Sequence, residues 1–176
     1  MTTTEEDWKA VYEPRLGSAL SEVVLLAYDF EVQEVADTRN EPIIPVEGAV
    51  GLVFEGYEPF ALTWQQFGGP YDFGLDTASM DFCGPYGLDR VRVGHEGGWG
   101  TVRGAVLEKV SLQAYDDAPE GVIAGIGHHL RSEAGQHVLW VFIGAKDHVA
   151  PFDGQIVTID TRLPGADILV DRRVIQ

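Results

Sequence analysis

Residues 17–29 read Gly-Ser-Ala-Leu-Ser-Glu-Val-Val-Leu-Leu-Ala-Tyr-Asp, and residues 104–116 read Gly-Ala-Val-Leu-Glu-Lys-Val-Ser-Leu-Gln-Ala-Tyr-Asp. The two stretches align without a gap and share seven residues, including the opening glycine and the closing Ala-Tyr-Asp. A repeat that spans about half the chain is typical of a duplicated supersecondary unit, whereas a solenoid needs three or more short repeats. The pair therefore predicts two similar units related by a pseudo-twofold.

Further landmarks follow in the same order after each stretch. We align Glu47-Gly48 with 120–121, Trp64 to Gly68 with 140–144, and Asp76-Thr77 with 160–161. The predicted pseudo-repeats are 17–77 and 104–161, joined by a Gly- and aromatic-rich segment at 67–104. The length of 176 residues fits one compact domain, 1–176.

The local pattern predicts a mainly β fold, with a β-rich α+β fold as the alternative, and a short N-terminal helix. Thr4 has the place of an N-cap and Asp7 that of a capping-box acid, and Pro14 and Gly17 end the helix. Residues 39–45 are predicted to form a loop, because Pro42 and Pro45 exclude a central strand there. Runs of apolar and β-branched residues predict strands at 23–35, 50–54, 60–64, 106–115, 121–130, 137–143, 155–160 and 168–174.

The charge of the chain is acidic and uneven. The net charge is −16, and residues 1–87 carry 16 acidic side chains but only 3 basic ones. Between Arg39 and Arg90 there is no Lys, Arg or His. Such a field repels nucleic acid and anionic membranes and attracts a basic protein. The plainer alternative is that the charge serves solubility alone.

The composition also bears on the compartment of the protein. Cys83 is the single cysteine, which excludes an intramolecular disulfide and a cysteine-based zinc cluster. The first eight residues lack the basic and apolar regions of a signal peptide. We therefore expect a cytoplasmic protein. We expect no cofactor, because no Gly-rich phosphate loop stands between a strand and a helix.

The segment 67–104 is the candidate partner-binding site. Aromatic side chains give rigid contact area in interfaces, and carboxylates attract a cationic partner. The alternative is that the aromatic side chains point inward and fix the segment. The candidate residues are Tyr71, Asp72, Phe73, Asp76, Asp81, Phe82, Tyr86 and Asp89.

Histidines supply a weaker, alternative site. A hairpin turn at 132–135 predicts that His129 and His137 are neighbours across two strands, with His128 beside them. Cross-strand histidines can share a metal, with Asp147 or His148 as a third ligand. The plainer interpretation is that all three are polar residues of an edge strand.

The repeated Tyr-Asp pairs, 28–29 and 115–116, have a structural and a functional interpretation. They could form a symmetric pocket at a pseudo-twofold axis. We favour a structural role, in which the aspartate accepts backbone N–H bonds in the next turn. The serines show no Gly-x-Ser-x-Gly elbow, and no local motif makes Cys83 a nucleophile.

Without a catalytic motif, the sequence favours a non-catalytic binding protein that engages a basic partner through an acidic, aromatic surface. By analogy of type, small acidic β-rich proteins of this kind include immunity and antitoxin proteins that occlude a toxin. The alternative is a metal-dependent or small-molecule-binding β-barrel protein that uses the histidine hairpin. A third possibility is an assembly module whose oligomeric state the sequence does not give.

Overall fold

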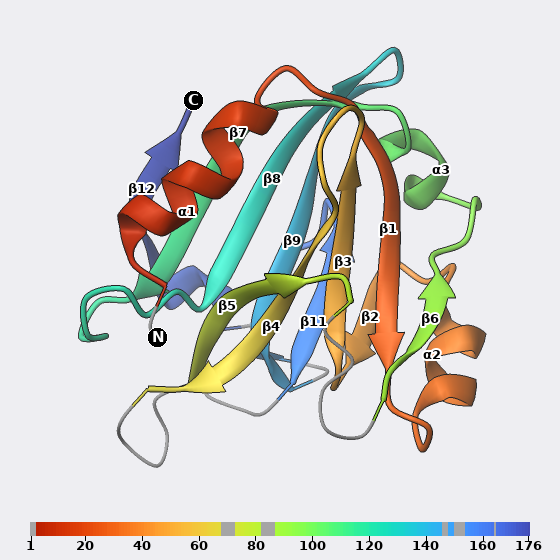
Figure 1. Cartoon of the computed structure of the whole chain (residues 1–176), viewed down its shortest axis with the longest axis horizontal. Helices are drawn as coiled ribbons and strands as arrows, with labels where there is room; N and C mark the ends of the chain where they lie inside the picture. The colour runs from red at the N-terminus through yellow and green to blue at the C-terminus, as the bar shows by residue number, and fades with distance from the viewer. Residues whose placement is uncertain (1–2, 68–72, 82–86, 146–147, 150–153, 164) are drawn as a thin grey trace.

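The protein is mainly β, with two antiparallel sheets and a short N-terminal helix (Figure 1). The computed structural model describes residues 3–67, 73–81, 87–145, 148–149, 154–163 and 165–176. The first sheet has the order β5 (Phe73–Ser79), β4 (Phe60–Gln66), β3 (Ala49–Phe54), β1 (Leu20–Ala27) and β6 (Asp89–Arg92). The second has the order β12 (Leu169–Ile175), β7 (Val106–Tyr115), β8 (Gly125–Ser132), β9 (Gly135–Ala145), β11 (Gln155–Ile159) and β2 (Ile43–Val46), and β10 (His148–Val149) pairs with β9.

One hydrophobic core lies between the two sheets. Leu25 and Leu52 of the first sheet belong to the same buried cluster as Val110 and Leu139 of the second. Each fully buried aliphatic side chain contributes roughly 1.5–3 kcal/mol relative to exposure. The face of each sheet that lines this core is called its inner face below, and the opposite face its outer face.

Helix α1 (Glu5–Tyr12) covers part of the inner face of the second sheet (Figure 1). The predicted capping box is confirmed: Asp7 N–H donates to Thr4 Oγ1 (3.2 Å), and Thr4 N–H donates to the Asp7 carboxylate (2.8 Å). Trp8 and Tyr12 are buried in the shared core. A 3-10 turn, η1 (Glu13–Arg15), follows where the proline was expected to end the helix.

Two predictions for the first half are corrected. The predicted strand 23–35 ends at Ala27, and residues 32–38 form helix α2 (Val32–Thr38) instead. Val35 is buried there, so packing outweighs the low helix propensity of valine. Residues 43–46 form a strand, β2, but at the edge of the sheet, where a proline is tolerated.

The segment 67–104 also has more regular structure than the sequence indicated. Strands β5 and β6 and the short helix α3 (Gly98–Val102) lie within it. Outside this segment, a 3-10 turn, η2 (Ala166–Ile168), precedes β12. The glycines that indicated loops are therefore partly within strands. Gly74 in β5, for example, is buried, and a Cβ there would lie 2.7 Å from the ring of Phe67.

The strands of the two sheets follow corresponding orders. The order β5-β4-β3-β1-β6 in the first sheet has the counterpart β11-β9-β8-β7-β12 in the second. The first half of the chain also contacts the second: β2 pairs with β11, and Leu75 N–H of β5 donates to the O atom of Ile123, just before β8 (2.7 Å). β1 thus has the place in its sheet that β7 has in the other.

The two repeated stretches meet through mirrored hydrogen bonds. Gly17 N–H donates to Leu107 O (2.8 Å), and Gly104 N–H donates to Leu20 O (2.7 Å). The two stretches are offset by 87 residues, and this same offset relates the donor and the acceptor of one bond to those of the other. The two repeated stretches therefore contact each other through a reciprocal pair of hydrogen bonds.

The later landmarks do not occupy corresponding places. The pairing β7–β8 has a bulge at residue 108, between Leu107 and Lys109, where β1–β3 has one at residue 21. When the two sheets are aligned at these bulges and the strand pairing is followed outward, Trp64 of β4 has the position of Ile143 of β9 and not that of Trp140. The alignment of Trp64 with Trp140 is therefore wrong, and the duplication itself stays a prediction.

No helix in the described parts of the chain has the length and apolarity needed to cross a membrane.

Candidate functional site

The predicted partner-binding residues fall into two groups. Tyr71, Asp72, Phe82 and Tyr86 lie outside the described residues. Phe73, Asp76, Asp81 and Asp89 are described, and they do not form one cluster. Phe73 and Asp76 are on β5, at one edge of the first sheet, whereas Asp89 begins β6 at the other edge.

Each of the described four has its own environment. Phe73 packs against the shared core and meets Trp64 edge-on, with ring centroids 5.9 Å apart. Asp76 is half-buried, and this burial raises the pKa of its carboxyl. Asp81 and Asp89 are exposed, and Asp81 lies 3.7 Å from the guanidinium of Arg90. Phe73 thus follows the inward-pointing alternative, whereas Asp81 and Asp89 are exposed at the surface.

The loop that joins β1 to α2 carries the most exposed large hydrophobic side chain in the described part of the chain. Phe30 is 73% exposed. Its ring stacks on Tyr28, with centroids 5.6 Å apart and an interplanar angle of 14°. Asp29, between them in sequence, is also exposed. Aromatic side chains, Phe included, are enriched in the contact areas of protein interfaces.

Glu31 fixes this loop. Its side chain is buried, with 7% of the residue exposed, and its carboxylate accepts three backbone N–H bonds. Tyr28 N–H and Gly48 N–H donate to Oε1 (3.1 Å each), and Glu47 N–H donates to Oε2 (2.8 Å). The role that we expected of Asp29 belongs to Glu31. The carboxylate connects the β1–α2 loop, which carries Phe30, to the β2–β3 turn.

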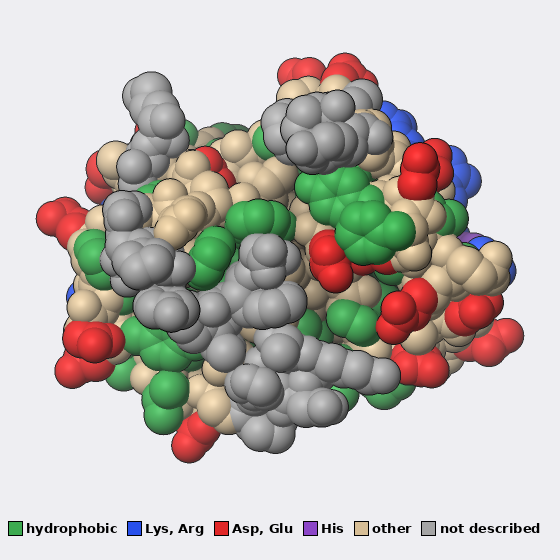
Figure 2. Space-filling model, turned by 90° about the horizontal axis from the view of Figure 1, so that it is seen from below, with side chains coloured by type: hydrophobic (Ala, Val, Ile, Leu, Met, Phe, Trp, Pro, Cys, Tyr) green, Lys and Arg blue, Asp and Glu red, His purple; other side chains and the backbone are tan. Residues whose placement is uncertain are grey.

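Further acidic side chains lie on the two elements next to this loop. Glu34 and Asp37 of α2 and Glu47 of the β2–β3 turn are exposed, and Arg39 is the one basic residue between 16 and 89. Figure 2 views this end of the molecule and shows Asp and Glu side chains spread among hydrophobic ones, while Lys and Arg lie at the rim of the view. We call the exposed residues Asp29, Phe30, Glu34, Asp37 and Glu47, together with Tyr28, the acidic tip.

The histidine hairpin does not bring its three histidines together. The register of β8 and β9 pairs His129 with Val138, and His137 with Leu130, so the expectation that His129 and His137 are cross-strand neighbours was wrong. His128 and His137 lie on the inner face and His129 on the outer face, since side chains alternate along a strand. In the described part of the chain, no three His, Cys, Asp or Glu side chains are close enough to hold a metal ion.

His128 is a core residue. It is completely buried, its Nδ1–H donates to Leu139 O (3.0 Å), and Tyr12 Oη–H donates to its Nε2 (2.8 Å). Burial lowers the pKa of His128 to about 4 and raises that of Tyr12. Both rings are therefore neutral at pH 7, and each polar atom of His128 has a partner.

His129 faces the outer side of the second sheet. Its Nε2 lies 2.9 Å from Ser111 Oγ, and its ring meets Trp140 edge-on at 6.3 Å. Burial lowers the pKa of His129, and the charge of Lys109 lowers it further. Ser111 was missed by the sequence reasoning. The only signal was the alternation of polar residues 109, 111 and 113 with apolar ones along β7.

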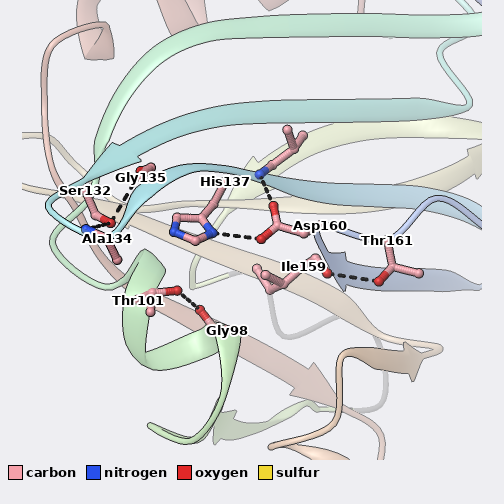
Figure 3. A network of polar contacts seen from close by, with 10 residues as sticks. Gly98, Thr101, Ser132, Ala134, Gly135, His137, Ile159, Asp160 and Thr161 are labelled. Atoms are coloured by element: carbon pink, nitrogen blue, oxygen red, sulfur yellow. Dashed lines mark hydrogen bonds and ion pairs between the residues drawn. The ribbon is translucent and has the colours of Figure 1, made fainter.

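His137 forms a pair with Asp160 at the end of β11 (Figure 3). Its Nδ1–H donates to Asp160 Oδ2 (2.7 Å), and Val138 N–H donates to Asp160 Oδ1 (2.7 Å). Asp160 has a φ of 52°, a left-handed conformation that aspartate tolerates better than most residues. His137 Nε2 is buried and has no hydrogen-bond partner among the described residues. The pair joins β9 to β11 beside helix α3.

Comparisons of the chain with models of protein families, with curated proteins and with solved structures found no match.

Proposed function

We propose that this chain is a non-catalytic protein-binding module whose acidic tip docks on a basic partner and occludes it. By type, an immunity or antitoxin protein that blocks a basic toxin has this design. The observation that carries the proposal is Phe30, which is 73% exposed and stacked on Tyr28 in a loop held by three hydrogen bonds to Glu31.

A preorganised aromatic anchor favours binding because little side-chain or loop entropy is lost on association. Ordering a flexible side chain at an interface costs about 0.5–1.5 kcal/mol, and the stacking on Tyr28 has already restricted Phe30. Exposing this apolar surface to water is unfavourable in the free protein. Burying it against a partner would recover that free energy. A large exposed hydrophobic side chain on a rigid loop is thus better explained by docking than by folding.

The surrounding charge selects the partner. Asp29, Glu34, Asp37 and Glu47 lie on the loop of the anchor or on the elements next to it, and the half of the chain that carries them has 16 acidic and 3 basic residues. Carboxylates around an apolar anchor speed association with a cationic surface and repel acidic proteins. Asp81 and Asp89 of the predicted site add to the same field from the two ends of the segment that joins β5 to β6.

Capture from a lysate of the native host tests the proposal. The full chain, a Phe30→Ala variant and a Glu133→Lys variant serve as baits at low salt and at about 0.5 M salt, where the Debye length is only a few ångströms. Glu133 is exposed in the β8–β9 turn, far along the strands from the tip, and is the control. One basic protein should bind the wild type and the control, be lost with Phe30→Ala, and weaken at high salt. Equal capture by all three baits would refute the tip as the binding surface.

We also infer that the two sheets arose by duplication of one β-unit. The corresponding strand orders, the bulges at residues 21 and 108, and the mirrored bonds of Gly17 and Gly104 support this. The acidic tip follows β1, and its counterpart after β7 differs: there Arg172 donates to Tyr115 O (3.0 Å) and Asp116 O (3.1 Å). On this view, the tip is a feature that one of the two units acquired.

A further inference from the structure

A surface hollow of about 520 Å³ lies near the β8–β9 turn of the second sheet, and its lining includes Leu130 and His137 of the inner face together with Glu108 and Gln176. Lys109 of β7, His129 of β8 and Gln136 and Val138 of β9 line it. Three of these four side chains are polar, and the lysine and the histidine are half-buried rather than free in water. We call this the second hollow.

The first sheet has a hollow of about 400 Å³ in the corresponding place. In the β1–β3 pairing, Glu22 opposes Val53 directly after the bulge, as Lys109 opposes His129 after the bulge of β7–β8. The next outward pair is Val24 with Gly51 in one sheet and Ser111 with Gly127 in the other. Val24 and Val53, which line the first hollow, thus have the strand positions that Ser111 and His129 have in the second sheet. Of these two, His129 lines the second hollow.

The comparison shows that this position in the fold does not need polar side chains. Valines fill it in the first sheet. In the second sheet Ser111 is buried, with 5% of the residue exposed, and the imidazole of His129 is half-buried. One hydrogen bond of 2.9 Å between these two side chains compensates for their burial. Burying polar groups costs free energy that an apolar pair would avoid. A polar pair kept at such a place indicates a ligand that uses it.

The charges of the two hollows are also arranged differently. In the first, Arg92 Nε lies 2.8 Å from Glu22, and Arg90 lies 3.7 Å from Asp81, so its cations are paired within the hollow. In the second, Glu108 is paired with Arg131 (3.0 Å), but the Lys109 ammonium forms no ion pair within the described ranges. Lys109 is therefore a cation of this lining without an ion-pair partner among the described residues, although Glu108 lines the same hollow and Asp171 acts on His129.

Ser111 and Trp140 set the orientation of His129. When Ser111 Oγ–H donates to Nε2, the proton of the neutral ring resides on Nδ1, which becomes a donor on the ring edge away from Ser111. Trp140 restricts the ring from the side, and a Cβ on Gly127 would lie 2.6 Å from the indole, so that indole is itself closely packed. An imidazole N–H, an ammonium and the Gln136 amide are together suited to an anion.

We propose that the second hollow binds a small anion of the carboxylate or phosphate class, which Lys109 and His129 contact and for which Ser111 acts as a positioning residue. The proposal is independent of the acidic tip, because the two lie on different elements. It assigns the second sheet a ligand and leaves the first sheet without one, in accordance with the residues at the corresponding positions.

Titration of the full chain with inorganic phosphate, and separately with acetate, tests the proposal. Chloride at matched ionic strength is the reference, and the NMR signals of the His129 ring and the Gln136 side-chain amide are followed. Phosphate or acetate should shift both sets of signals saturably, and chloride should not. Saturation by phosphate alone would mean that the ligand is of the phosphate class. Saturation by both anions would mean that a carboxylate group is sufficient for binding.

Two variants and a control complete the design. Lys109→Gln should weaken the anion about tenfold or more, since it removes a charge-assisted hydrogen bond. The double change Ser111→Val with His129→Val installs the residues of the first hollow, and should abolish the saturable shift of Gln136 in a chain that stays folded. Lys9→Gln on α1, which packs on the inner face, should bind as the wild type does. No saturable shift for either anion, or equal affinity in Lys109→Gln, would overturn the proposal.

Discussion

Tyr12 Oη lies 2.8 Å from His128 Nε2 in the middle of the shared core, and joins the N-terminal helix to strand β8. Burial lowers the pKa of His128 from its ordinary 6.5 to about 4. The unfolded chain therefore binds a proton at a higher pH than the folded one does. The stability that the neutral histidine contributes is fully present above pH 6.5 and is lost as the pH falls towards 4, in total roughly 3 kcal/mol.

Urea unfolding at pH 7, 5.5 and 4.5, for the wild type and a His128→Gln variant, measures this effect. Glutamine can still accept a hydrogen bond from Tyr12 but does not titrate. The free energy of unfolding of the wild type should fall more steeply with decreasing pH than that of the variant. His129 and the carboxylates titrate in both proteins, so their contributions cancel in the comparison. Parallel pH profiles would show that His128 does not titrate as a buried group.

Most of the β structure could be predicted from the sequence because its strands carry a strong local signal. The prediction 106–115 coincides with β7, and the turns at 55–59 and 132–135 fall where β3–β4 and β8–β9 turn. Helix α1 was predictable because Thr4 and Asp7 form a capping box that is recognisable from the local sequence. These features depend on neighbours in sequence, which is the information that one chain supplies.

Features that depend on distant contacts were not predictable. Helix α2 has a buried Glu31 at its start, and no side chain of its own caps it. The acidic tip was missed because Phe30 looks like the continuation of an apolar strand, although the acids on both sides of it, at 29 and 31, were a usable signal. The histidine hairpin was misjudged by one residue of register, which moves a side chain to the other face of a sheet.

The mirrored glycines give a test of the duplication in terms of stability. Gly17 and Gly104 have φ values of 83° and 79°, and a Cβ at either would meet no atom within 4 Å. Gly17→Ala and Gly104→Ala should therefore each cost only the backbone strain of a left-handed alanine, about 1–2 kcal/mol. Thermal or urea unfolding should give similar losses for the two. Losses that differ by several kcal/mol would show that the positions are not equivalent.

The three bonds to Glu31 give a test of the rigidity of the acidic tip. Glu31→Ala leaves three backbone N–H groups without their acceptor and should lower the free energy of unfolding by about 2–4 kcal/mol. The amides of Tyr28, Glu47 and Gly48 should then exchange with solvent faster at pH 7. Glu34→Ala, at an exposed position of α2, is the control and should leave their exchange as it is. Unchanged protection in Glu31→Ala would mean that the carboxylate does not hold the loop.

The association rate constant of the purified basic partner tests the central claim, binding through the acidic tip, most directly. It is measured for the wild type, for Asp29→Lys combined with Glu34→Lys, and for Glu133→Lys, at low salt and at about 0.5 M salt. The tip variant should associate at least about tenfold more slowly at low salt, and the gap should largely close at high salt, because steering is electrostatic. The control should follow the wild type closely. Equal slowing by Glu133→Lys and the tip variant, or no slowing by either, would contradict docking at the tip.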